Sequence, residues 1–366
     1  MRIAFIYGQF SLGPRPIDFK NMWTSPRGLT GSELSCIMLC KAMRERGHDA
    51  QLYMGKLPPD GSKWDVAYSW LEPDQLRTVK AKLRMVNQQV NDFAYCQPGY
   101  DKFVDIYTSP SKTHRDYLLS LCDECCDPRK WRILPNGVDP SQYDVSKKVP
   151  GRVIYASSPD RGLHLLLEAW PEIKRRVPHA HLRVFYEMSE HLKTFGHQEL
   201  FVLNDGRGQP VVERGLTEIG YRIRYIQRAL ELYKRFDVEN VGSVSRERMA
   251  VEMSEAEVLA YPCDTIRFTE GFSVTTMEAC AAGAVPVIRG VDSLSEIYGD
   301  LPSCLADTNQ RKFISAVCMA LDNTEGFADD CRSIGSRIAG QHTWPILAEK
   351  LEEIIREASG SADNTA

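Results

Sequence analysis

The chain of 366 residues has no long apolar run and no excess of charge of either sign. None of its apolar segments reaches the roughly 18 residues of a membrane-spanning helix, and the apolar stretch near its start is far shorter than that of a secretory signal. Lys and Arg total 45 against 49 Asp and Glu, so the net charge of −4 gives no reason to expect a nucleic-acid partner. We therefore expect a cytoplasmic protein that does not bind nucleic acid, an expectation that leaves peripheral contact with a membrane open.

The common signatures of metal and dinucleotide sites are also missing. The sequence contains no Asp-X-Asp, no His-Glu-X-X-His, no P-loop and no Gly-X-Gly-X-X-Gly. Its 11 cysteines are an odd number scattered among apolar neighbours, as suits reduced thiols in a core. Cys122, Cys125 and Cys126 lie close together, but no second Cys pair or nearby His pair completes four ligands. We expect neither a bound metal nor a nicotinamide cofactor.

Length and hydrophobic pattern predict two α/β domains. A chain of 366 residues is too long for one ordinary core, and short apolar runs alternate with helical patterns in both halves. A polar, turn-rich segment near 136–150 separates these halves. We predict a first domain over 1–145 and a second over 146–342, with an insertion at 187–236. An amphipathic helix is predicted at 343–358.

Individual elements follow from the same patterns. A helix is predicted from about Ser32 to Arg46, with Gly47 as its stop. The predicted strands of the first domain are 3–7, 50–54, 66–70, 83–88, 104–108 and 132–135. Those of the second are 153–156, 182–186, 258–261 and 285–288. The insertion carries a basic helix whose Arg222, Arg224 and Arg228 are expected on a solvated face, with contact to an acidic acceptor as the alternative.

One candidate anion site follows the strand at 153–156. Ser158 is a good helix N-cap and Pro159 a good first helical residue, so a helix is predicted to start there. Its free amides would face the carboxyl edge of the sheet, where ligands of open α/β sheets bind, and Arg161 adds a permanent charge. An ordinary capped helix with a solvated Arg161 would show the same pattern.

A second candidate site follows the strand at 258–261. A loop with Glu270 and Gly271 leads into a helix predicted over 274–282. Glu278 lies eight positions after Glu270, which would be about 12 Å if both were helical and is wider than the roughly 5 to 9.5 Å of glycosidase acid pairs. Because Glu270 precedes the helix, the two acids can hold different parts of one elongated ligand. The amides of residues 271–273 suit a diphosphate between them.

The segment E-G-F-S-V-T-T-M-E-A-C-A-A-G-A-V-P-V resembles the E-x7-E signature and following strand of retaining glycosyltransferases of the family 4 type. Three other segments resemble the same family in order: the glycine loop and first helix over 30–50, the segment TSPSKTHRDYL, and ILPNGVD at the domain junction. The similarity is high over 241–291, moderate over 104–186, and thin over the first hundred residues and the insertion.

The resemblance implies a GT-B fold, in which two Rossmann-like, doubly wound parallel-sheet domains face a cleft and the C-terminal helix crosses back onto the first domain. It implies a hexosyltransferase that moves a sugar from a UDP- or GDP-linked donor to an acceptor hydroxyl, with retention of configuration and without metal or cofactor. The acceptor would be a glycan, a lipid-linked glycan or a small molecule. A non-catalytic nucleotide-sugar-binding protein and a GT-B epimerase or phosphorylase are the alternatives.

The same resemblance implies roles for single residues. Glu270 would contact the donor sugar, Glu278 the ribose, and the amides of Gly271 to Val274 the sugar and diphosphate. Arg161 stands where the family usually has a phosphate-binding Lys. The full predicted site comprises Gly28, Thr30, Gly31, Asn91, Asp92, Ser158, Arg161, Arg267, Glu270, Gly271, Phe272, Ser273, Val274 and Glu278.

The chain departs from the family pattern at two positions. Ala156 stands where the family usually has an Arg, so that phosphate contact is missing or comes from Ser157, Ser158 or Arg267. The usual His after the fourth strand is also absent. The polar candidates in its place are Gln89, Asn91 and Asp92.

Overall fold

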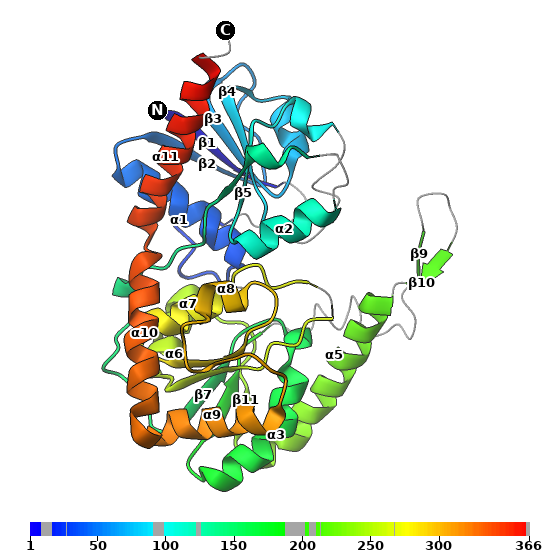
Figure 1. Ribbon diagram of the computed structural model, residues 1–366, viewed down its shortest axis with the longest axis vertical. Coiled ribbons are helices and arrows are strands. Elements are labelled where there is room, and N and C mark those ends of the chain that lie inside the picture. Colours follow the sequence, from blue (N-terminus) through cyan, green and yellow to red (C-terminus); the bar gives the residue numbers. More distant parts are fainter. Residues whose placement is uncertain are drawn as a thin grey trace.

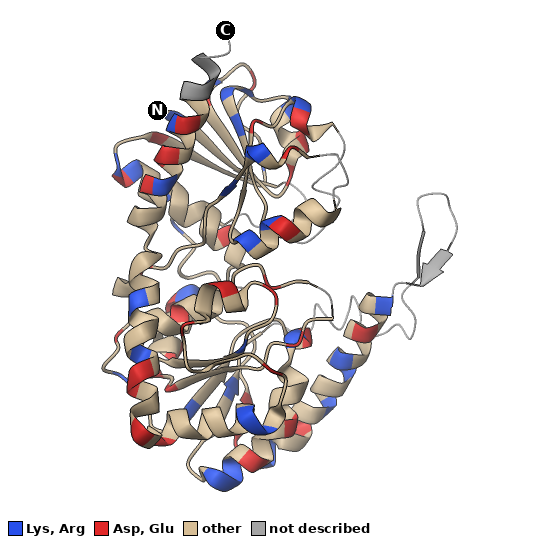
Figure 2. Ribbon diagram, viewed as in Figure 1, with Lys and Arg blue, Asp and Glu red and all other residues tan. Residues whose placement is uncertain are grey.

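The computed structural model contains two six-stranded parallel sheets, one in each half of the chain (Figure 1). The structure describes residues 1–8, 17–26, 28–90, 99–121, 126–186, 202–204, 210–212, 214–266 and 268–363. Figure 2 shows Lys and Arg interspersed with Asp and Glu over both halves, in keeping with the nearly balanced composition. No helix in the described segments is long and apolar enough to cross a bilayer.

The first sheet has the strand order β2-β1-β3-β4-β5-β6. Its strands are β1 (Arg2–Tyr7), β2 (Asp49–Met54), β3 (Lys63–Trp70), β4 (Lys80–Asn87), β5 (Ile106–Ser109) and β6 (Trp131–Ile133). The central strand β1 is buried from Ile3 to Tyr7 because helices cover both faces of a parallel sheet. Ile3 of β1 lies opposite Ala50 on one side and Val66 on the other. All six strands predicted for this domain are present.

Helix α1 (Gly31–Glu45) starts and ends close to where the sequence predicts. Thr30 and Glu33 form a capping box, in which each side chain bonds the backbone of the other. Gly47 follows the helix with a φ of +86°, a conformation that favours glycine. Helix α2 (Lys112–Leu121) follows β5 and lies on the side of the first domain that faces the second (Figure 1).

The second sheet has the order β11-β8-β7-β12-β13-β14. Its strands are β7 (Arg152–Tyr155), β8 (His181–Val184), β11 (Val238–Asn240), β12 (Val258–Tyr261), β13 (Val285–Arg289) and β14 (Cys304–Leu305). Its helices are α3 (Leu163–Arg176), α5 (Arg214–Tyr233), α6 (Arg246–Glu255), α7 (Val274–Ala281), α8 (Leu294–Tyr298), α9 (Gln310–Asp322) and α10 (Phe327–Gln341). The edge strands β11 and β14 were not predicted, because three and two residues are too short to show an alternating pattern.

The predicted start of the helix after β7 is wrong. Ser158 and Pro159 begin a short 3-10 turn, η6 (Pro159–Arg161), and α3 starts only at Leu163. Ser158 makes no side-chain cap, and its hydroxyl bonds Asp160 instead. Gly162 separates the two elements with a φ of +112°, and a Cβ there would lie 2.5 Å from the carbonyl oxygen of Pro262. The break therefore comes from a close backbone approach that the local sequence does not show.

Helix α5 packs against α3 and connects β8 to β11. Its Ile226, Ala229 and Leu230 belong to the core of the second sheet. The prediction of a solvated Arg222 is wrong: its guanidinium bonds the carbonyl oxygens of Asp160 and Asp264 and lies 2.9 Å from the Asp264 carboxylate. A two-stranded antiparallel sheet, β9 (Val202–Asn204) and β10 (Pro210–Val212), precedes this helix.

The C-terminal helix α11 (Trp344–Asp363) continues from α10 and crosses back onto the first domain, as predicted (Figure 1). It packs against α1 and places Trp344, Leu347 and Leu351 in the core of the first sheet. Arg46, just after α1, forms ion pairs of 2.9 and 2.8 Å with Glu349 and Glu352 of α11. Both predicted domain limits, 1–145 and 146–342, stay predictions.

Candidate functional site

The candidate site lies between the two domains, where the loop before α7 meets the start of α2 (Figure 1). Residues 269–273, which we call the acidic loop, join the segment after β12 to α7. The amides of Thr269 and Glu270 donate to the Asp292 carboxylate at 2.9 and 3.0 Å. The carbonyl oxygen of Glu270 accepts from the amide of Ser293. The backbone at Glu270 is therefore held from the turn before α8.

Glu270 is 5% exposed and has two side-chain donors. Arg161 Nη1 lies 3.2 Å from Oε2 of Glu270, and the Tyr261 hydroxyl donates to the same oxygen at 2.5 Å. Burial opposes the charge of Arg161, but the carboxylate of Glu270 keeps the pKa of Arg161 above its ordinary value. The Arg161 side chain as a whole is 30% exposed. The structure thus joins two predicted site residues, one from the turn after β7 and one from the loop after β12.

Helix α7 begins beside this pair with a strained residue. Ser273 has a φ of +62°, and its hydroxyl accepts from the amide of Thr276. Tyr298 donates to the Ser273 carbonyl oxygen at 2.8 Å, which holds the turn. Within the described segments, the amides of Gly271, Phe272, Ser273 and Val274 donate to no protein group. These four N–H groups, with the positive end of the helix dipole, are suited to bind an anion.

Glu278 lies on the next turns of α7 and is only 3% exposed. It forms an ion pair with Arg246 at the start of α6, and the buried Tyr143 lies close to both side chains. Burial, together with the charge of Glu278, raises the pKa of Tyr143 above its ordinary value, so the hydroxyl stays protonated. Arg246 was not predicted as a site residue, because nothing in the sequence distinguishes it from a surface Arg at a helix start.

Two glycines of the first domain approach the second. Gly28 has a φ of +70°, and a Cβ there would lie 2.9 Å from the carbonyl oxygen of Val244. A Cβ at Gly31 would lie 3.0 Å from a methyl group of Val274, the first residue of α7. Thr30 lies between them as the N-cap of α1. Gly31 therefore meets the helix start to which the acidic loop leads, and Gly28 meets the segment before α6.

Three predicted site residues, Asn91, Asp92 and Arg267, lie outside the described residues. Gln89 is described, and both atoms of its amide are bonded to the Asn136 amide, at 3.0 and 2.9 Å. This reciprocal pair fixes Gln89 to the domain junction, so it is a poor candidate for a sugar contact. Ser157 follows Ala156, whose carbonyl oxygen accepts from the hydroxyl of Thr275 in the first turn of α7.

His114 of α2 lies against the acidic loop and was not predicted. It is fully buried, with Nδ1 2.7 Å from the Ser109 hydroxyl and Nε2 3.2 Å from the Val90 carbonyl oxygen. Burial lowers the pKa of His114 to about 4, so the imidazole is neutral at pH 7. A Cβ on Gly271 would lie 3.3 Å from this ring, so a larger residue there would require the ring to shift by a few tenths of an ångström.

The start of α2 also hydrogen-bonds the second domain. Ser111 Oγ lies 3.0 Å from the Gly271 carbonyl oxygen and 2.8 Å from Ser293 Oγ. The amides of Lys112 and Thr113 donate to the carboxylate of Glu296 in α8, at 2.9 and 2.7 Å. Glu296 therefore caps a helix of the other domain, where a carboxylate is favoured by the helix dipole. We call these contacts the interdomain cap.

Replacing Glu296 by Ala is expected to loosen the interdomain cap. The variant leaves two amides at the start of α2 without their carboxylate, which lowers the free energy of unfolding by about 1 kcal/mol. Small-angle X-ray scattering should show a larger radius of gyration, because one of the contacts between the domains is lost. Glu231→Ala, which removes an exposed carboxylate of α5, serves as the control. An unchanged radius of gyration in Glu296→Ala would mean that this cap does not hold the domains together.

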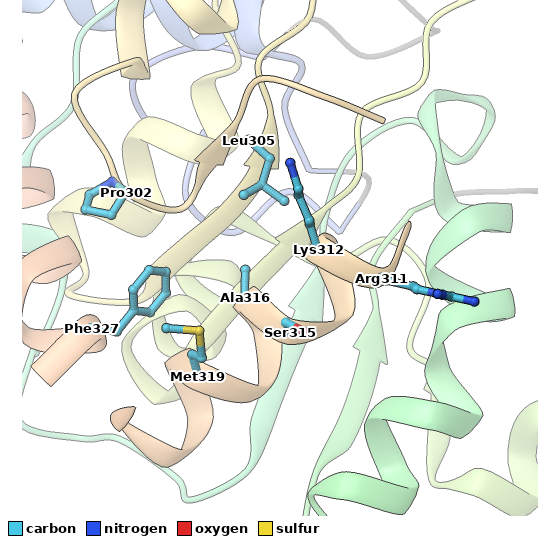
Figure 3. A pocket seen from close by; sticks show the side chains of 8 residues that line it. All are labelled: Pro302, Leu305, Arg311, Lys312, Ser315, Ala316, Met319 and Phe327. Carbon is cyan, nitrogen blue, oxygen red and sulfur yellow. The ribbon is translucent and has the colours of Figure 1, made fainter. Parts of the chain in front are cut away.

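Two other features of the described residues, Cys126 and a groove on the second domain, lie apart from the predicted site. No group of three His, Cys, Asp or Glu in the described segments could hold a metal ion. Cys126 is buried in a core cluster, while Cys122 and Cys125 lie outside the described residues. A shallow apolar groove between β14, α9 and α10, lined by Leu305, Met319 and Phe327, contains none of the predicted residues (Figure 3).

Solved structures share this architecture at low sequence identity. AviGT4, a glycosyltransferase involved in avilamycin A biosynthesis, is 14% identical with a TM-score of 0.63, and the match covers 98% of both chains. Anabaena Alr3699/HepE in complex with UDP and glucose is 12% identical with a TM-score of 0.65, covering 98% of this chain and 100% of that one. Sucrose-phosphate synthase from Thermosynechococcus elongatus is 13% identical with a TM-score of 0.62, covering 98% and 99%.

No protein-family model and no curated protein matches the chain. At such low identity, the structural likeness shows the fold. The two Rossmann-like domains facing one another, with the C-terminal helix crossing back, are the GT-B arrangement predicted from the sequence, and this prediction is confirmed.

Proposed function

We propose that this chain is a retaining glycosyltransferase that moves a hexose from a UDP- or GDP-linked donor to an acceptor hydroxyl without a metal ion. The observation that carries the proposal is the start of α7. Its four open amides lie between two buried acids, Glu270 and Glu278, and each acid is paired with an arginine. Solved structures of the same fold include complexes with UDP and with UDP-glucose, which supports a nucleotide-sugar ligand.

The charges of the site suit such a donor. A diphosphate placed between two bare carboxylates would be repelled, because like charges at a few ångströms in a poorly solvated site cost several kcal/mol. Arg161 and Arg246 neutralise the two acids, so the amides of 271–274 and the other N–H groups of Arg161 can bind the anion. Glu270 then accepts from hydroxyls of the sugar, and Glu278 lies toward the ribose end.

The reaction proposed for this arrangement has few steps. The acceptor hydroxyl attacks the anomeric carbon on the face from which the nucleotide diphosphate leaves, and its proton passes to a phosphate oxygen. The bond from the anomeric carbon to the leaving phosphate oxygen breaks as the new glycosidic bond forms. Arg161 and the helix amides offset charge that grows on the departing diphosphate, which is the kind of preorganised stabilisation that contributes most in enzymes. The acceptor class is a glycan, a lipid-linked glycan or a small molecule.

Donor binding is expected to raise the melting temperature. At a ligand concentration of 100 times Kd, stability increases by about 2.7 kcal/mol, which gives a rise of a few degrees for domains of this size. UDP-, GDP- and ADP-linked sugars should be screened in parallel, with inorganic pyrophosphate as the control for simple anion binding. A rise with one class of nucleotide sugar, followed by slow hydrolysis of that donor without acceptor, is the expected result.

Each negative outcome of the screen has a definite meaning. No rise with any nucleotide sugar would contradict the proposed donor. A rise without hydrolysis or transfer would favour the non-catalytic binding protein, and a product other than a glycoside would favour an epimerase or phosphorylase.

A further inference from the structure

Tyr261 is the last residue of β12, and its hydroxyl contacts the carboxylate of Glu270. Its side chain is 1% exposed, and its ring makes an edge contact with Tyr155, with 5.9 Å between ring centroids. The thiol of Cys263 donates to the Tyr261 hydroxyl at 3.3 Å, and the hydroxyl donates to Glu270 Oε2 at 2.5 Å. The packing leaves this hydroxyl little freedom to move, and its hydrogen is directed at the acid.

Both side-chain donors to Glu270 bind the same carboxylate oxygen. Arg161 and Tyr261 both bond Oε2, whereas Oε1 accepts no hydrogen bond from any residue that the structure describes. The terminal torsion of a glutamate is broad and only weakly restrained on its own. Two donors on one oxygen remove that freedom, so the second oxygen has a fixed direction.

A tyrosine and an arginine do different things at this carboxylate. Arg161 contributes a charge and has five N–H donors, of which one bonds Glu270. Tyr261 contributes a directed hydrogen bond without adding charge. Because Tyr261 also holds the acid in place, Arg161 can direct its other N–H groups to an anion while Glu270 keeps its orientation.

We propose that Tyr261 is a positioning residue that fixes Glu270 so that Oε1 alone meets the donor sugar. The proposal rests on the proposed function, since it assigns the atom through which that site would recognise a sugar hydroxyl. Under this proposal, Glu270 binds sugar hydroxyls through Oε1 only. It does not bind a pair of hydroxyls through both carboxylate oxygens.

The test is Tyr261→Phe, which removes only the hydroxyl. We expect kcat to fall about 10- to 100-fold, as for a reacting group displaced by a fraction of an ångström to an ångström. The second measurement is the loss of activity with donors that each lack one sugar hydroxyl. A merely structural role of Tyr261 would not change this loss. The wild type should lose activity sharply with the deoxy donor whose missing hydroxyl faces Oε1, and this penalty should shrink at least several-fold in Tyr261→Phe.

Tyr68→Phe is the matched control, because Tyr68 is also fully buried and hydrogen-bonded but lies in the first sheet. It should keep the wild-type penalty for every deoxy donor. An unchanged deoxy penalty in Tyr261→Phe, with normal wild-type turnover, would overturn the positioning role and leave the proposed function intact. If the chain binds the donor without transferring the sugar, the rise in melting temperature replaces turnover as the measured quantity. The loss of this rise with each deoxy donor is then compared between the wild type and Tyr261→Phe. A wild-type chain that neither binds nor turns over any donor would overturn both proposals.

Discussion

The Glu270→Gln variant is expected to lose about 10³-fold of its sugar-transfer activity while staying folded. A glutamine keeps the shape of the side chain but loses the negative charge that Arg161 and Tyr261 hold in place. Hydrogen bonds to a charged group contribute roughly 1.5 to 3 kcal/mol, about twice as much as neutral ones. Loss of one preorganised polar contact at a reacting centre typically costs 10²- to 10³-fold in kcat.

Turnover of the donor with excess acceptor measures this effect, and circular dichroism with a thermal melt confirms the fold. Glu231→Gln, an exposed acid on α5 with its own ion pair, is the control and should keep wild-type turnover. If Glu270→Gln turned over at the wild-type rate, Glu270 would have no part in the reaction, and the mechanism proposed for the acidic loop would be wrong.

The Arg246→Met variant should have the largest effect on stability. Arg246 and Glu278 form an ion pair, and their side chains are only 9% and 4% exposed. Removing one partner leaves the Glu278 carboxylate buried without its countercharge. Breaking a buried pair in this way lowers the free energy of unfolding by about 3 to 5 kcal/mol.

Urea unfolding measures this loss as a lower midpoint with an unchanged slope. The double variant Arg246→Met with Glu278→Gln should recover part of the stability, because no buried charge is left unpaired. Arg175→Met on α3 removes an exposed ion pair and should leave the midpoint unchanged. A midpoint near wild type in Arg246→Met would show that water or another cation reaches Glu278, and the ion pair would then not be needed for folding.

The sequence predicts those parts of the site that are contiguous along the chain. The acidic loop, the helix over 274–281 and the strands on either side have strong local signals, namely apolar runs, Gly283 and the spacing of the two acids. The C-terminal helix has a clear apolar face, and its return to the first domain was expected from the resemblance. The two α/β domains could be predicted for the same reason, because the longer strands and helices show their own periods, whereas the GT-B arrangement was expected from the resemblance.

Side-chain pairs between distant segments could not be predicted in this way. Arg246 meets Glu278 across 32 positions, and Arg161 meets Glu270 across 109. Such pairs depend on which strands are neighbours and on where each helix starts. Arg222 shows the same limit. Its position in the helical pattern predicts a solvent-exposed side chain, but its guanidinium bonds the Asp264 carbonyl oxygen in the loop after β12. Gly162 moves the start of α3 because of a backbone contact with Pro262, which has no local signal.

The helix α11 has a consequence for how the chain is made. Arg46 bonds Glu352, which lies 306 residues later, and the apolar side of α1 is covered by Trp344, Leu347 and Leu351. A nascent chain therefore completes its first sheet long before the helix that covers α1 has left the ribosome. During that interval the first domain exposes an apolar surface, which makes it a candidate client for chaperones until the last helix docks.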